Sequence, residues 1–192
     1  MTTLTSWVDS DGSTIIFQSS EKDAIAQELR KINVRYEYRE PLEVPSGSSA
    51  EEIMEIFSDI IAEFGKNENY TTVDIAQLHP SDSPEARELA AAARAKFLNE
   101  HTHDDDEVRY FVQGSGIFYL HIDGKVHAVL CTAGDLLDVP ANTTHWFDMG
   151  TRPDFTAVRF FKVDDGWIGD FTGSDISSRF PTYDELIASV PA

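Results

Sequence analysis

The feature that most constrains the fold of this chain is a run of six short apolar segments in its second half. Each segment has the length of a β-strand and is rich in β-branched and aromatic residues, and turns with glycine, proline or aspartate separate them. Strands that follow one another at such short intervals predict an antiparallel sandwich or barrel. The segments are 107–113, 117–122, 125–131, 136–140, 145–149 and 155–161.

Helices are expected mainly before this run of strands. Apolar side chains recur with helical spacing between two short apolar segments, 13–18 and 34–38, which indicates a strand, a helix and a strand. A longer helix is expected to begin behind a capping box of Ser49 and Glu52 and to stop at Gly65. The expected helices are 19–32, 49–65, 83–97 and 183–189.

The composition excludes several classes of partner. The chain has 192 residues, a formal net charge of −19 and a sequence pI of about 4.4, so it would repel a phosphate backbone or an anionic membrane surface. Cys131 is the only cysteine, and no window is long and apolar enough for a membrane span. We therefore expect a cytoplasmic protein that binds neither nucleic acid nor membranes. The oligomeric state is not determined by these features, and a monomer is the working expectation.

Two polar segments next to the strands carry candidate metal ligands. In HTHDDDE, the odd-numbered residues His101, His103 and Glu107 point to one side of an extended chain, as does Arg109. In GDLLDVPANTTHW, a proline turn leads to His145 at the start of another strand. Three imidazoles and one carboxylate suit iron, nickel, manganese, copper or zinc. The alternative is a solvated acidic turn with surface histidines, which is the commoner outcome for an isolated His-x-His pair.

The spacing of these residues resembles the two cupin motifs, which favours the metal site over the solvated turn. Asn142 stands where the second motif usually has glycine, and asparagine tolerates the left-handed backbone that such a turn needs. The matching residues are His101, His103, Glu107 and, after six further positions, Gly114 in the first motif, and Gly134, Pro140 and His145 in the second.

The resemblance implies a mainly β fold with an α elaboration. The expected fold is a cupin double-stranded β-helix, a jelly-roll barrel preceded by N-terminal helices and strands. We expect residues 1–192 to form a single domain. Within it, 1–99 would be the α/β elaboration, 100–163 the metal-binding cupin core and 164–192 a C-terminal tail.

The flanks of the two motifs are similar to the acireductone dioxygenase family, particularly its bacterial members. The similar stretches are EVRYFVQGSGIFYL, VPANTTHWFDMG and AVRFFKVDDGWIGDFTGSDISSRFP. Arg109 follows Glu107 by two residues as in that family. Phe147 follows His145 by two residues, and Trp167 lies in the matching GWI.

This resemblance implies a metal-dependent dioxygenase of methionine salvage. By similarity, His101, His103, Glu107 and His145 would bind one Fe²⁺ or Ni²⁺ ion per chain, and the partners would be an acireductone and dioxygen. The iron form would give a 2-keto acid and formate, and the nickel form methylthiopropionate, formate and carbon monoxide. The sequence identifies neither the resident metal, nor the dominant branch, nor a general base.

Three further residues have a role implied by the resemblance and a structural alternative. Arg109 would stabilise the anionic oxygens of the substrate as a catalytic and substrate-binding residue, or it would form an ion pair with one of the neighbouring acids. Phe147 and Trp167 would line the substrate pocket, or they would be ordinary core aromatics. His121 and His127 are expected on opposite sides of the sheet, so they cannot share a metal.

Two other functions stay open on the sequence. One is a different cupin enzyme with the same four ligands, such as a sugar-phosphate isomerase or another dioxygenase. The other is a non-catalytic cupin that binds a small ligand, because a fold alone does not determine a function.

Overall fold

Strand β6 (Glu107–Ile122) belongs to both sheets of the structure, a computed structural model that describes residues 1–68, 70–162 and 168–189. Its first half pairs with β8 and β10, and its second half pairs with β7 and β9. The strand bends at Gly114, where φ is +65° and a Cβ would lie 1.8 Å from the carbonyl oxygen of Asp154. Only glycine fits this bend, so one strand passes between the sheets without a loop.

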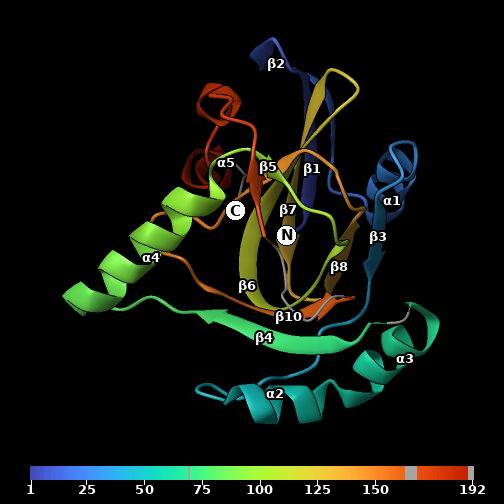
Figure 1. Ribbon diagram of the computed structural model, residues 1–192, viewed down its shortest axis with the longest axis vertical. Helices are drawn as coiled ribbons and strands as arrows, with labels where there is room; N and C mark the ends of the chain where they lie inside the picture. Colours follow the sequence, from blue (N-terminus) through green and yellow to red (C-terminus); the bar gives the residue numbers. More distant parts are fainter. Residues whose placement is uncertain (69, 163–167, 190–192) are drawn as a thin grey trace.

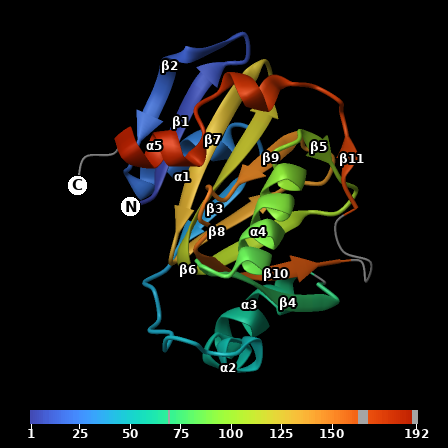
Figure 2. The ribbon, with the colours of Figure 1, turned by 90° about the vertical axis from the view of Figure 1, so that its left-hand side faces the viewer.

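Two antiparallel sheets that share β6 form a barrel (Figures 1 and 2). One sheet has the order β11-β5-β9-β6-β7-β1-β2, and in the other β10 pairs with β4 and β6 while β8 pairs with β3 and β6. The other strands are β1 (Thr3–Val8), β2 (Asp11–Ser19), β3 (Arg35–Tyr38), β4 (Thr72–Leu78), β5 (His101–Thr102), β7 (Lys125–Thr132), β8 (Asp135–Val139), β9 (His145–Asp148), β10 (Phe155–Phe161) and β11 (Asp170–Phe171).

The helices lie outside the barrel. Helices α2 (Ala50–Ile56) and α3 (Ser58–Glu68) lie beyond β4 in Figure 1, and Ile53 and Phe57 pack against the outward face of β6. Helix α1 (Lys22–Arg30) precedes β3 and adds its buried side chains to the barrel core. Among the described residues no helix is long and apolar enough to cross a membrane. The remaining helical segments are α4 (Pro84–Phe97), η1 (Ile176–Arg179) and α5 (Tyr183–Ser189).

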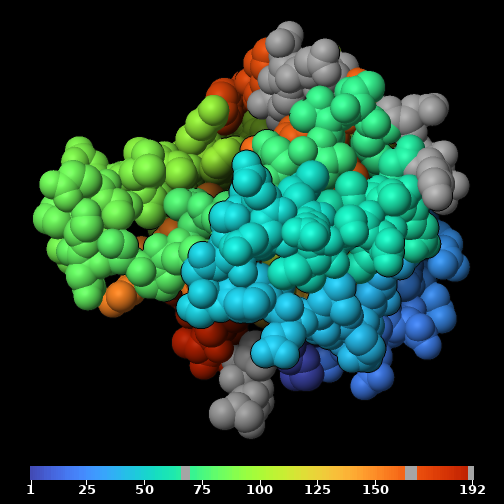
Figure 3. Space-filling model, turned by 90° about the horizontal axis from the view of Figure 1, so that it is seen from below, coloured from blue at the N-terminus to red at the C-terminus, as the bar shows by residue number. Residues whose placement is uncertain are grey.

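Helix α4 stands out from the body of the molecule (Figure 3), and none of its side chains is buried. Arg94 joins it to β9 by a two-point ion pair with Asp148, at 2.7 and 3.0 Å. Asp148 also accepts a hydrogen bond from the backbone N–H of Tyr183 at the start of α5. The buried carboxylate of Asp148 therefore links α4, β9 and α5. It fixes α4, the helix that directly precedes β5 in the chain.

The two faces of β6 exchange places at its bend. Before Gly114, Phe111 points into the barrel and Tyr110 points outward beneath α2. After the bend, Phe118 points into the barrel and Tyr119 points outward. The register between β6 and β10 shifts at Val112, two residues before Gly114, which is the mark of a β-bulge. The bulge keeps apolar side chains in the barrel on both sides of the bend.

The mainly β fold with an α elaboration is confirmed, whereas several element boundaries were wrong. Segments 107–113 and 117–122 are one strand, because the glycines between them make a bend and not a turn. The helix expected over 49–65 is two helices with a break at Phe57. Gly65 does not end α3, which continues to Glu68. The expected division into 1–99, 100–163 and 164–192 stays a prediction.

Side-chain caps are present at the starts of α2 and α4, whereas the serine cap expected before α1 is absent, because its N-cap is Glu21 and forms no side-chain cap. Ser49 and Glu52 form both hydrogen bonds of the capping box, and the Ser83 side chain accepts from Ala86 at the start of α4. Strands β1 and β4 were not expected from the sequence. In β4, a charged residue interrupts the apolar pattern, and that residue, Asp74, is paired with Arg159 of β10.

A pH dependence of stability follows from a buried histidine of β7. Only 3% of His127 is exposed, and its Nδ1 lies 2.8 Å from the hydroxyl of Ser6. Burial, assisted by Lys125, lowers the pKa of His127 from 6.5 to about 4. The unfolded chain therefore takes up a proton between pH 6.5 and 4 that the folded chain does not. The stabilising contribution of neutral His127 is complete above pH 6.5 and is lost as the pH falls toward 4.

We predict that His127→Gln removes this part of the pH dependence. Between pH 6 and 5, the unfolding free energy of the parent protein should fall more steeply with falling pH than that of His127→Gln. The difference in slope should be about 1.4 kcal/mol per pH unit, which corresponds to one proton. Chemical denaturation of metal-free proteins at a series of pH values measures it. Ser6→Ala is the matched control, which should keep the parent slope because burial is the main cause. Equal slopes for parent and His127→Gln would contradict the prediction.

Candidate metal centre

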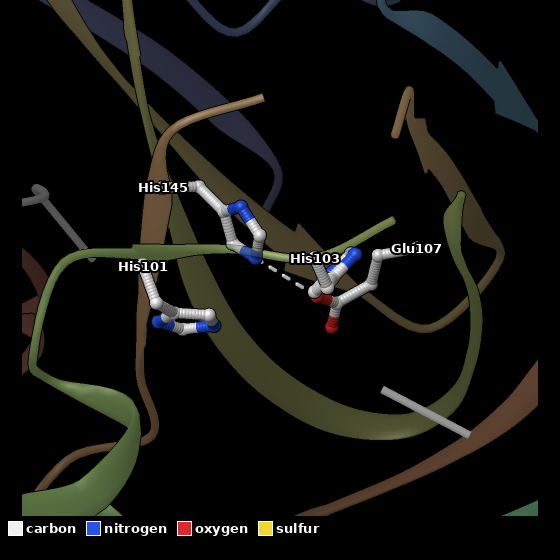
Figure 4. Close-up of side chains that lie close together, drawn as sticks. All are labelled: His101, His103, Glu107 and His145. Carbon is white, nitrogen blue, oxygen red and sulfur yellow. Dashed lines mark hydrogen bonds and ion pairs between the residues drawn. The ribbon is translucent and has the colours of Figure 1, made fainter. Parts of the chain in front are cut away.

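Four buried side chains from the starts of three strands and from one connection converge on one another (Figure 4). His101 opens β5, Glu107 opens β6 and His145 opens β9, while His103 lies in the connection between β5 and β6. One nitrogen of each imidazole and one oxygen of Glu107 all lie within 4.8 Å of one another. The structure thus brings together the four donors that the sequence predicted.

Strand pairing and one tight turn place these donors. His101 pairs with His145 across β5 and β9, and His145 pairs with Leu120 across β9 and β6. Asn142, in the turn before β9, has φ +62°, and its backbone N–H donates to the carbonyl of His103 at 2.8 Å. The left-handed backbone expected at Asn142 is therefore present, and it ties the two motif segments together.

Each of the three imidazoles is oriented by a backbone carbonyl. His101, His103 and His145 have Nδ1 at 2.7, 2.6 and 2.8 Å from the carbonyl oxygen of a residue two positions away in the chain. A donor at Nδ1 leaves the Nε2 lone pair for a metal, which is the usual arrangement around metal-binding histidines. The backbone of this chain therefore selects the tautomer that a metal requires.

The short contacts of Glu107 suit a cation among the donors. Its Oε2 atom lies 2.9 Å from Nε2 of His103 and 2.9 Å from Nε2 of His145. Lone pairs at this separation repel each other unless a proton or a cation lies between them. Neighbouring ligands of an octahedral ion lie about 3.0 Å apart when the bonds are about 2.1 Å. Nitrogen and carboxylate donors at this spacing fit a first-row divalent metal.

The charge of the site is set by Glu107 and its neighbours. Burial raises the pKa of Glu107, but Arg109 and the imidazoles of His103 and His145 outweigh burial and hold this pKa well below its ordinary value. Burial lowers the pKa of His101, and the adjacent imidazoles lower it further despite the hydrogen bond to Asn99. The carboxylate is therefore an anion, ready for a cation.

Arg109 lies beside the donors and contacts one of them. Its Nε and Nη2 atoms lie 2.7 and 2.6 Å from Oε1 of Glu107. Its guanidinium carbon is 5.3 and 5.0 Å from the ring centres of Phe118 and Phe147. The ion pair with a neighbouring acid, considered as an alternative to a functional role, is thus present. Because that acid is Glu107, the pair belongs to the site.

Phe147 occupies space left by Gly116, a residue for which the sequence predicted no role. The ring is 1% exposed and lies 4.7 Å, centre to centre, from Phe118. A Cβ on Gly116 would lie 2.3 Å from this ring, so only glycine leaves room for it. No local signal distinguishes Gly116, because the contact joins residues from two strands. Trp167, the third predicted pocket residue, lies outside the described residues.

The remaining histidines do not join the four donors. His121 and His127 lie on opposite sides of the sheet, as predicted, because His121 pairs with Val126 and His127 pairs with Leu120. His79 has a side chain that is 49% exposed and contacts Asp154. Within the described part of the chain, the four buried donors are the group that could hold a metal ion.

Comparison with known proteins identifies the family. The ARD/ARD′ family matches residues 12–169. An acireductone dioxygenase from Saccharopolyspora erythraea is 50% identical over 189 residues, which are 98% of this chain and 100% of that protein. The chain belongs to the acireductone dioxygenase family.

Two further members of this family extend the comparison. An acireductone dioxygenase from Frankia alni is 52% identical over 188 residues, which are 97% of this chain and 91% of that protein. The solved structure of acireductone dioxygenase from Bacillus anthracis, with a cadmium ion in its active center, has a TM-score of 0.73 and 26% identity. The match covers 89% of this chain and 98% of the Bacillus anthracis chain. The predicted metal-dependent dioxygenase is confirmed by this membership.

We predict that His145→Ala loses most of its metal while the barrel stays folded. The site would lose one of four donors, so the affinity should fall by more than the roughly 10–100-fold that loss of an outer partner causes. Metal analysis after dialysis, together with circular dichroism, measures both properties. His79→Ala is the control, because His79 lies outside the cluster. Full metal occupancy in His145→Ala would exclude His145 as a ligand.

Proposed function

We propose that the chain acts in methionine salvage, with one Fe²⁺ or Ni²⁺ ion per chain held by His101, His103, Glu107 and His145. The observation that carries the proposal is the convergence of three Nε2 atoms with fixed tautomers on one buried carboxylate. The solved relative with a metal ion in its active center supports it. A cytoplasmic location and a monomer remain predictions from the sequence.

The proposed substrate is 1,2-dihydroxy-3-keto-5-methylthiopentene, which dioxygen cleaves. With iron the products would be 2-keto-4-methylthiobutyrate and formate, and with nickel methylthiopropionate, formate and carbon monoxide. When bound, the metal supplies Lewis acidity and a template for two oxygens of the substrate. This assignment comes from the resemblance to the family and from the donor set of the site.

The chain itself would contribute charge and orientation. Arg109 is a buried cation in contact with Glu107, so its guanidinium would stabilise the anionic oxygens of a deprotonated substrate beside the metal. Its planar fork matches a pair of oxygens better than an ammonium group does. Phe147, which lies on the same face of β9 as His145, would exclude water from this pocket. The pocket role of Trp167 rests on the resemblance alone.

Arg109→Met should retain the metal and lose turnover. Removal of one preorganised charge is expected to cost about 3 kcal/mol of transition-state stabilisation, which is about a hundredfold in kcat. Metal content must be measured alongside turnover, because the variant also removes the ion pair with Glu107. Arg109→Lys, which keeps the charge, should retain part of the activity. Wild-type turnover in Arg109→Met would show that the residue is structural.

Metal exchange tests the reaction itself. We expect protein reloaded with Fe²⁺ to form keto acid and formate without carbon monoxide, and the same batch reloaded with Ni²⁺ to release carbon monoxide. Headspace gas and acid products under dioxygen are the measurements. If neither form consumes the acireductone faster than the free metal does, the proposed activity is wrong. If both forms give the same products, only the metal-controlled branch is wrong.

A further inference from the structure

A second buried carboxylate lies directly before the first metal donor. Glu100 immediately precedes His101 in the chain, and its side chain is 4% exposed. Its Oε1 atom accepts a hydrogen bond from Nδ1 of His121 at 2.7 Å, and its Oε2 atom accepts one from the hydroxyl of Thr172 at 2.6 Å. A buried carboxylate with a different partner on each oxygen fixes the positions of both partners.

One of these partners, His121, forms hydrogen bonds directly before both β5 and β9, the strands that begin with His101 and His145. Its side chain binds Glu100, the residue before His101, and its backbone N–H donates to the carbonyl of Thr144, the residue before His145, at 2.9 Å. The other ring nitrogen of His121 lies 3.3 Å from a carboxylate oxygen of Asp9. A single residue of β6 thus contacts the chain immediately before two of the four donors.

The other partner, Thr172, fixes the strand that covers His101. The backbone N–H of Thr172 donates to the carbonyl of Glu100 at 3.1 Å, which extends the pairing of β11 with β5 (Figure 2). Phe171 pairs with His101 across these strands, and the two rings lie 5.6 Å apart. Both strands have only two residues, so few other hydrogen bonds hold them.

We propose that Glu100 is a positioning residue of the metal centre, which holds His101 in place by clamping β5 between His121 and Thr172. The inference rests on the proposed function, because it takes His101 as a metal ligand. The Glu100 carboxylate contacts neither substrate nor metal in this role. It acts through the backbone of β5 and through the ring of Phe171 against His101.

The test removes each contact and measures the metal site directly. Glu100→Gln replaces one accepting oxygen with an amide nitrogen that cannot accept, and Thr172→Val removes the hydroxyl at an exposed position without loss of volume. Both variants should bind Ni²⁺ about tenfold more weakly in competition with a chelating dye. They should also alter the ligand-field absorption bands of the Co²⁺-loaded protein. Thr172→Ser, which keeps the hydroxyl, should restore the parent values.

Asp135→Asn is the matched control for loss of a buried carboxylate. Asp135 accepts hydrogen bonds from Thr2, Tyr36 and Thr132 at a place on β8 away from the donors. It should lower stability and leave Ni²⁺ affinity and the Co²⁺ spectrum unchanged. An equal loss of affinity in this control would overturn the proposal, since a general loss of stability would then explain the effect.

The remaining outcomes separate this inference from the function on which it rests. If Thr172→Val and Glu100→Gln bind Ni²⁺ as tightly as the parent and give the same Co²⁺ spectrum, the clamp does not position His101. The proposed metal site would be unaffected by that result. If Glu100→Gln does not fold, Thr172→Val decides alone. If the parent protein fails to bind Ni²⁺, the proposed metal site is wrong, and the clamp is wrong with it.

Discussion

The bend of β6 at Gly114 is the constraint on which the rest of the structure depends. Because one strand belongs to both sheets, Glu107 and Arg109 enter the barrel from one sheet while Leu120 pairs with His145 in the other. A side chain at 114 would collide with the backbone at Asp154, directly before β10, so only glycine allows the strand to bend here. The bend at Gly114 therefore fixes the position of Glu107 in one sheet relative to His145 in the other.

The charges of the buried side chains then determine which kind of ion this site can bind. Glu107, Arg109 and three imidazoles are buried together, which would be unfavourable for unpaired charges. Each imidazole donates to a backbone carbonyl, and Arg109 takes one oxygen of Glu107, so the unused lone pairs all face one point. A cation at that point gives the remaining lone pairs their partner. The donors of the site therefore have fixed positions, and their lone pairs favour a cation between them.

Much of the site could be predicted from the sequence because its signals are local. The alternation of side chains along a strand was enough to place Glu107 and Arg109 on one face. The capping box at Ser49 depends on residues three positions apart, and it is present. The break at Phe57 was not predicted, because the apolar spacing continues through it and packing against Tyr110 lies far away in the chain.

The sequence by itself determined the donor types and their spacing, since these follow from motif distances within short segments. Its strand periodicity left a sandwich or a barrel open, and the resemblance to the cupin motifs favoured the barrel. The tertiary structure alone decided which distant residues support the donors. Gly116 makes room for Phe147, and Glu100 joins His121 and Thr172, through contacts between strands that are far apart in the chain. Such contacts leave no periodic pattern, because a glycine or a carboxylate has no preferred partner until the sheets bring one within reach.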